Sequence, residues 1–187
     1  MSAIDLSGDV ALVAVALLTA NLLLGLLLSV GYNPVRQWPR RRFKLFTFHN
    51  WTGYVALAAC AIHAAILLFV ASPRFTLYDV LVPLQSPVQP TSNTLGAIAL
   101  YLVALVVLTS YFRAAIGRHR WKTIHYATYA AAAVFFLHGV IADPLLQGRT
   151  SDYFDGEKVY IEACAVAVAV VTAWRIRHRR ARRPRRA

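Results

Sequence analysis

Four of the six histidines lie inside long apolar segments, at spacings that could support chemistry. His49 and His63 are fourteen residues apart between residues 47 and 70, and His125 and His138 are thirteen apart between 121 and 142. Either step is roughly 20 Å along a helix. A lone intramembrane histidine is usually a hydrogen-bonded packing residue. Two matched pairs instead favour axial ligation of two b-type haems, because ionisable groups at membrane depth are costly and usually functional.

The two spacings differ in helical phase. Fourteen residues fall about 40° short of whole turns, so His49 and His63 point to one side of their helix. Thirteen residues leave His125 and His138 about 140° apart on a straight helix. Local winding or tilt of the second segment is therefore needed to bring both rings to one haem stack.

The composition is that of an integral membrane protein. The chain has 187 residues, of which 58% are hydrophobic and 15% charged, and its mean hydropathy is +0.52. Segments 8–30, 47–70, 94–113, 121–142 and 158–175 are long and apolar enough to span a bilayer. The sequence therefore predicts an all-α bundle of about five transmembrane helices.

Charge placement predicts the orientation. Seventeen of the 20 Lys and Arg residues follow the first, third and fifth spans, whereas all eight acidic residues fall on or near the other side. The positive-inside rule then places the N-terminus outside and the C-terminus in the cytoplasm, and we expect a bacterial cytoplasmic membrane. The N-terminus lacks the basic region of a secretory signal, so the first span is expected to be retained. The net charge of +12 is accounted for by topology, and nucleic-acid binding is not expected.

The same topology predicts how the histidines pair. The second and fourth spans are separated by one complete span, so both run from the cytoplasm outward. Histidines at similar depth must then face each other. We expect His49 and His125 to hold an inner haem iron, and His63 and His138 an outer one.

The basic loop before the second span has two interpretations. Arg41, Arg42 or Lys44 would pair with the propionates of a haem at nearby His49. Alternatively, the loop sets the topology and Trp38 anchors it at the interface.

Two further residues are candidates for cofactor binding. Arg74 follows His63 closely and would neutralise an outer propionate, or it snorkels to the interface. Gly53 lies one turn beyond His49 and would let a flat porphyrin approach the backbone, or it serves ordinary helix packing.

Several motifs resemble the ferric reductase-like transmembrane domain family, which includes ferric reductases, NADPH oxidases and the haem-binding membrane partner of periplasmic methionine sulfoxide reductase. They are WTGY before His63, LYDVLVPLQSP, TSY, RHRWKTIHYATY and LHG. The resemblance covers roughly residues 30 to 175 and implies that the four histidines match the family's haem ligands. We therefore divide the chain into a first helix (1–30), a haem-binding core (31–175) and a basic tail (176–187).

The sequence departs from that family in two respects. Many members have six spans, whereas five are predicted here. Many also carry a cytoplasmic flavin and nicotinamide domain, for which the terminal IRHRRARRPRRA leaves no room. No glycine-rich dinucleotide fingerprint is present, so we expect a separate donor protein or quinol, with any flavin or quinone supplied by a partner. Cys60 and Cys164 show no metal-type spacing, and no Cys-x-x-Cys-His motif for c-type attachment occurs.

Three functions are consistent with these features. The first is a di-haem b electron-transfer protein that passes electrons from a cytoplasmic donor to an external acceptor. The second is a quinone-linked cytochrome b subunit of a membrane complex. The third is a non-haem metal or proton transporter that uses the histidines transiently, for which a colourless purified protein would be expected.

Overall fold

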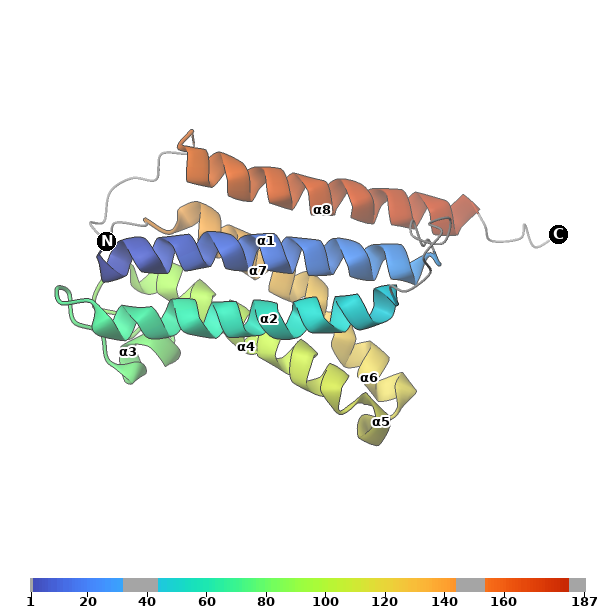
Figure 1. Cartoon of the computed structure of the whole chain (residues 1–187), viewed down its shortest axis with the longest axis horizontal. Coiled ribbons are helices and arrows are strands. Elements are labelled where there is room, and N and C mark those ends of the chain that lie inside the picture. The colour runs from blue at the N-terminus through green and yellow to red at the C-terminus, as the bar shows by residue number, and fades with distance from the viewer. Residues whose placement is uncertain (1, 32–43, 144–153, 182–187) are drawn as a thin grey trace.

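Five long apolar helices dominate the structure (Figure 1). The computed structural model describes residues 2–31, 44–143 and 154–181. Its candidate membrane spans are Ala3–Ser29, Leu45–Phe69, Pro90–Tyr111, Arg118–Ile141 and Gly156–Ala181. The all-α fold and the five predicted spans are thus confirmed, while the sidedness of the ends stays a prediction.

The described helices comprise the elements of the five spans and two short helices between spans, α3 and α5. They are α1 (Ala3–Ser29), α2 (Leu45–Ile66) with the 3-10 turn η2 (Leu67–Phe69), α3 (Leu77–Leu81), α4 (Pro90–Tyr111), α5 (Arg113–Ile116), α6 (Arg118–His125), α7 (Ala127–Ile141) and α8 (Gly156–Ala181).

The fourth span is interrupted at one residue. α6 ends at His125 and α7 begins at Ala127. At the junction, the Tyr126 N–H donates to Thr123 O at 3.2 Å and the Tyr129 N–H donates to Tyr126 O at 3.1 Å. These bonds to the third preceding residue wind the chain more tightly than an α-helix. This tighter winding turns His138 toward the face of His125, in the direction that the thirteen-residue spacing requires.

Pairs of helices pack closely around a core of small and branched side chains. α1 lies along α2, α4 along α7, and α8 against α1 and α7. Ala56 is 0% exposed and packs with Leu18, Val103 and Ala131 in mid-bundle. Small residues at such positions let helix backbones approach closely. Large apolar side chains such as Trp51 face outward, where a bilayer would solvate them.

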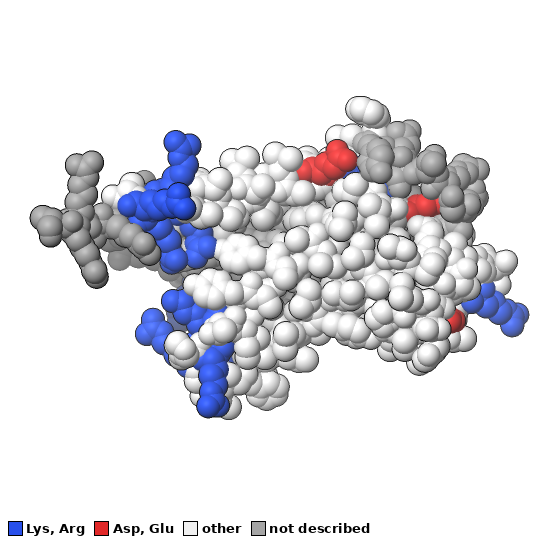
Figure 2. Space-filling model, turned by 180° about the vertical axis from the view of Figure 1, so that it is seen from behind, with Lys and Arg blue, Asp and Glu red and all other residues white. Residues whose placement is uncertain are grey.

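The charged side chains separate along the bundle. Figure 2 shows most Lys and Arg side chains gathered at one end and Asp and Glu toward the other. The basic end is where α1, α4 and α8 finish and where α2 and α6 begin, and we call the opposite end the acidic end (Figure 1). α2 and the α6 and α7 span therefore run in the same direction.

Candidate cofactor sites at two histidine pairs

Two pairs of histidine rings face each other across the bundle. α2 carries His49 and His63, while α6 carries His125 and α7 carries His138. The ring centroids of His49 and His125 lie 6.5 Å apart, with the ring planes at 79°. The centroids of His63 and His138 lie 6.4 Å apart, with the planes at 60°. The structure thus places together the residues that topology pairs, and iron binding by each pair stays a prediction.

The spacing within each pair suits one metal ion between two imidazole nitrogens. A metal–nitrogen bond is about 2 Å long and a ring centroid lies about 1 Å behind its nitrogen, so two rings on one ion have centroids about 6 Å apart. Among the described residues, no three His, Cys, Asp or Glu side chains gather into a metal-binding group. A two-imidazole donor set suits an iron whose other ligands come from a porphyrin.

Hydrogen bonds at the acidic end fix the tautomer of both rings. Nδ1–H of His63 donates to the carbonyl of Ser7 at 2.9 Å, and Nδ1–H of His138 donates to the carbonyl of Ser92 at 2.8 Å. A carbonyl oxygen can only accept, so the proton must lie on Nδ1. The lone pair of Nε2 is then available to a metal, and the hydrogen bond makes the imidazole a better ligand.

The pair at the basic end is oriented in the same way by different acceptors. Nδ1–H of His49 donates to the carbonyl of Asn21 at 3.1 Å. Nδ1 of His125 lies 3.3 Å from the Ser110 hydroxyl oxygen. The Ser110 hydroxyl donates its proton to the carbonyl of Val106 at 2.6 Å. It can therefore only accept a hydrogen bond from Nδ1–H of His125. All four imidazoles therefore hold Nε2 free of a proton.

Two glycines make room for the rings. A Cβ at Gly96 would lie 2.9 Å from Cε1 of His138, and a Cβ at Gly25 would lie 3.1 Å from Cε1 of His49. Each glycine comes four residues after the residue whose carbonyl accepts the ring's hydrogen bond. Side chains four apart on a helix lie on one face, so any larger residue there would cover that carbonyl. Sequence reasoning missed both; the only available signal was glycine inside an apolar helix.

α1 takes part in both histidine sites. It supplies the acceptor carbonyls of Ser7 and Asn21. Asn21 also donates to the Thr52 hydroxyl of α2 at 2.8 Å, as expected of an interhelical hydrogen bonder. Gly53 lines the cavity around His49, but a Cβ there would first meet the Asn21 amide at 3.4 Å. Gly53 thus contributes to the close contact of α1 with α2, and its role beside a haem stays a prediction.

A cavity that we call the basic pocket surrounds His49 and His125. Its volume is about 480 Å³. Five cationic side chains from α5, α6 and α8 line it, and no described Asp or Glu does. They are Arg113, Arg118, Lys122, Arg175 and Arg179.

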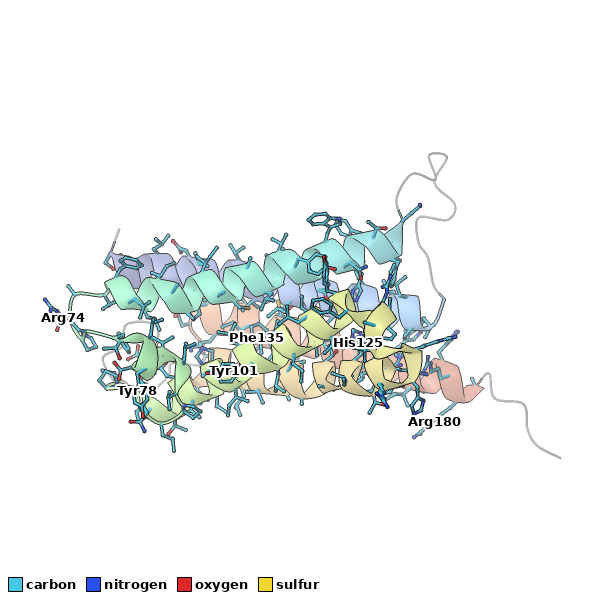
Figure 3. The ribbon with its side chains drawn as sticks, turned by 90° about the horizontal axis from the view of Figure 1, so that it is seen from below. Arg74, Tyr78, Tyr101, His125, Phe135 and Arg180 are labelled. Carbon is cyan, nitrogen blue, oxygen red and sulfur yellow. The ribbon has the colours of Figure 1, made fainter. Side chains whose placement is uncertain are left out.

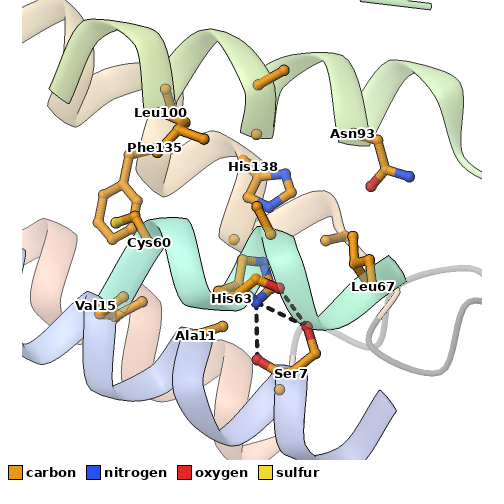
Figure 4. A pocket seen from close by; sticks show the side chains of 18 of the residues that line it. Ser7, Ala11, Val15, Cys60, His63, Leu67, Asn93, Leu100, Phe135 and His138 are labelled. Carbon is orange, nitrogen blue, oxygen red and sulfur yellow. Dashed lines mark hydrogen bonds between the residues drawn. The ribbon is translucent and has the colours of Figure 1, made fainter. Parts of the chain in front are cut away.

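The cavity around His63 and His138, which we call the acidic pocket, is smaller, with a volume of about 170 Å³ (Figure 4). Its wall is mainly apolar, with Phe135 directed between the helices toward the middle of the bundle. Three acidic residues and one cation line it, namely Asp79, Asp143, Glu157 and Lys158. Hydrogen bonds from the Thr76 side chain and backbone hold the pKa of Asp79 below its ordinary value, so this carboxylate is ionised at neutral pH.

The single cation of the acidic pocket is buried. Lys158 is 4% exposed, and its Nζ donates to the carbonyls of Gly139, at 2.8 Å, and Ala142. Gly139 lies in the last turn of α7, the helix that carries His138, and Ala142 directly follows that helix. A lysine at this position stabilises the C-terminal end of a helix. Sequence reasoning missed Lys158 because nothing local shows that it folds back onto α7.

Of the two arginines predicted to bind propionates, the structure describes only Arg74. Arg41 is outside the described residues. Arg74 is exposed, lines neither pocket, and lies beyond the bundle at the acidic end (Figure 3). Among the described residues, neither pocket is lined by an arginine that the sequence predicted to bind a propionate.

Comparison with known families gives one match. A family model described as "Ferric reductase like transmembrane component" matches residues 10–136, more than half of the chain. The matched region contains His49, His63 and His125 and ends two residues before His138. It also contains most of α1, including Asn21 and Gly25. Neither a curated protein nor a solved structure matches the chain.

Proposed function

Because the chain belongs to the family of ferric reductase-like transmembrane components, we propose that it is a di-haem b protein for electron transfer across a membrane. His49 and His125 would hold one haem, and His63 and His138 the other. The observation that carries the proposal is that each facing pair has both Nδ1 atoms hydrogen-bonded within the bundle and both Nε2 atoms free. Haem iron would supply reversible one-electron exchange at each position.

The protein's own contribution is to orient the ligands and exclude water. The carbonyl and hydroxyl acceptors hold each imidazole in one tautomer, and the glycines leave space for that orientation. Between the pockets, the packed side chains of Leu18, Ala56, Val103 and Ala131 fill the bundle. An apolar middle keeps protons and ions from following the electrons.

The charge distribution indicates which end of the bundle would meet the electron donor. The basic end would face the cytoplasm by the positive-inside rule, so a cytoplasmic donor or a quinol would deliver electrons near the basic pocket. An acceptor outside would receive them near the acidic pocket.

Haem stoichiometry tests the proposal with a matched control. The purified protein should contain about two haems b per chain by pyridine haemochrome analysis. His138→Ala and His125→Ala should each lose about one of them. His119 is exposed on the same helix as His125, so His119→Ala should retain both haems. A colourless wild-type protein, or equal loss in His119→Ala, would contradict the assignment.

A further inference from the structure

The basic pocket holds more positive charge than the described protein neutralises. Five Lys and Arg side chains line it, and none of the seven described acidic residues does. Segments 32–43 and 182–187 contain no Asp or Glu either. A haem brings two carboxylates, so at least three of the five cations would still have no counter-charge. This excess of positive charge would attract a further anion whether or not a haem is bound.

Several of these side chains are already held in place. The guanidinium of Arg113 stacks 4.6 Å from the centroid of the Phe46 ring, which leaves its N–H groups free. Arg175 donates through Nη1 to the Tyr129 hydroxyl, and its buried Nε has no hydrogen-bond partner among the described residues. Arg179 donates to the last turn of α1 at 2.9 Å. Such preorganisation lowers the entropy cost of binding an anion.

The location of the pocket indicates the class of anion. It opens among α1, α2, α4, α6 and α8 at the ends of their membrane spans, where phospholipid headgroups lie. Arginine recognises phosphate oxygens in a planar, two-pronged geometry. Basic pockets between transmembrane helices are known to bind anionic headgroups. We propose that the basic pocket binds the phosphate headgroup of an anionic phospholipid of the phosphatidylglycerol class.

The positive-inside rule explains why Lys and Arg lie at this end of the bundle, but it does not explain why five of them line one pocket. Arg120 and Arg177 lie on the same helices, α6 and α8, and are exposed at the same end, yet neither lines the pocket. They provide a matched control, since replacing them removes the same charge from the same end of the bundle.

The test is native mass spectrometry of the purified full chain with phosphatidylglycerol or phosphatidylcholine of identical acyl chains. The wild type should retain phosphatidylglycerol preferentially. Arg118→Gln/Lys122→Gln should weaken this binding about 25-fold, or about fivefold per charge. Arg120→Gln/Arg177→Gln should bind like the wild type. Equal weakening in both double variants, or no preference in the wild type, would overturn the proposal.

Inorganic phosphate at matched ionic strength distinguishes a lipid site from a general phosphate site. The lipid should stay bound, because its acyl chains contribute to affinity, and displacement by phosphate would overturn the lipid assignment. Visible spectra of the same samples report haem content separately. If no haem were present, the proposed electron-transfer function would be contradicted. The measured preference for phosphatidylglycerol would still test the lipid site on its own.

Discussion

The basic and acidic pockets repeat one ligand geometry in opposite electrostatic settings. Each contains two facing imidazoles with Nδ1 hydrogen-bonded and ring centroids 6.4 or 6.5 Å apart. Five cations line the basic pocket, whereas three acidic residues and one buried lysine line the acidic pocket. Reduction adds negative charge, which nearby cations stabilise and anions destabilise. We therefore expect a higher reduction potential at the basic pocket.

This difference has a consequence for electron flow. Transfer from the basic to the acidic pocket would run against the local potential difference. The driving force must then come from the donor and the acceptor rather than from the protein's charges. The bundle would conduct electrons without determining their direction.

The largest expected effect comes from removing space beside one ring. Gly96→Ala places a Cβ 2.9 Å from His138, which must displace the imidazole. We expect loss of most haem from the acidic pocket only, measured as a fall from about two to about one haem per chain. Gly25→Ala, where the contact is 3.1 Å, should cause a smaller loss at the basic pocket. The control is Gly8→Ala, whose Cβ would meet nothing within 4 Å; haem loss in this variant would contradict the steric argument.

The next effect concerns the buried lysine. Lys158→Met removes the donor to the carbonyls of Gly139 and Ala142, which should lower the free energy of unfolding by roughly 1 to 3 kcal/mol. It also removes the only cation among the described residues that line the acidic pocket, so the potential of that haem should fall while the other stays constant. Thermal unfolding and a spectroelectrochemical titration measure the two effects. An unchanged potential would show that Lys158 is purely structural.

A smaller effect is expected at the basic pocket from Ser110→Ala. The substitution removes the acceptor for Nδ1–H of His125 and leaves the other three imidazole hydrogen bonds intact. A ligand without this bond is a weaker electron donor, so the potential of the basic-pocket haem should rise. Haem content should remain at the wild-type level. Thr109→Ala, a neighbouring hydroxyl that bonds only to its own helix, is the control.

The smallest effect is expected from an exposed charge. Glu157→Gln removes one carboxylate from the rim of the acidic pocket and should raise the potential of that haem slightly. Because the side chain is exposed, salt should screen the effect, and at about 0.15 M the screening length is only about 8 Å. A shift that persists in high salt would mean that Glu157 acts by another route than its charge.

The sequence predicted the spans and the positions of the histidines because both depend on local pattern. Apolar length identifies a membrane helix, and a histidine within it stands out. The positions of His49 and His63 on one helix face also follow from helical phase. For His125 and His138 the same arithmetic revealed that extra winding was needed, but it did not locate the tightened turn at Tyr126.

The surroundings of the histidines could not be predicted because they depend on which helices touch. Ser7 lies 56 residues from His63, and Ser92 lies 46 from His138. No local signal joins residues so far apart. Arg74 was chosen for its proximity in sequence to His63, whereas Lys158, 95 positions after His63, is the cation that lines the pocket. Sequence proximity is a poor guide to which charge reaches a site in a helical bundle.

The most direct test of the two-pair assignment is low-temperature electron paramagnetic resonance of the oxidised protein, combined with haem counting. Imidazole planes at 79° and 60° leave the iron orbitals that interact with them nearly equal in energy, which produces strongly anisotropic low-spin signals. We expect two such signals, one from each haem. His125→Ala should lose the signal of the basic-pocket haem, and His138→Ala should lose that of the acidic-pocket haem. A high-spin haem in the wild type, or loss of both signals in every single variant, would contradict ligation by two independent histidine pairs.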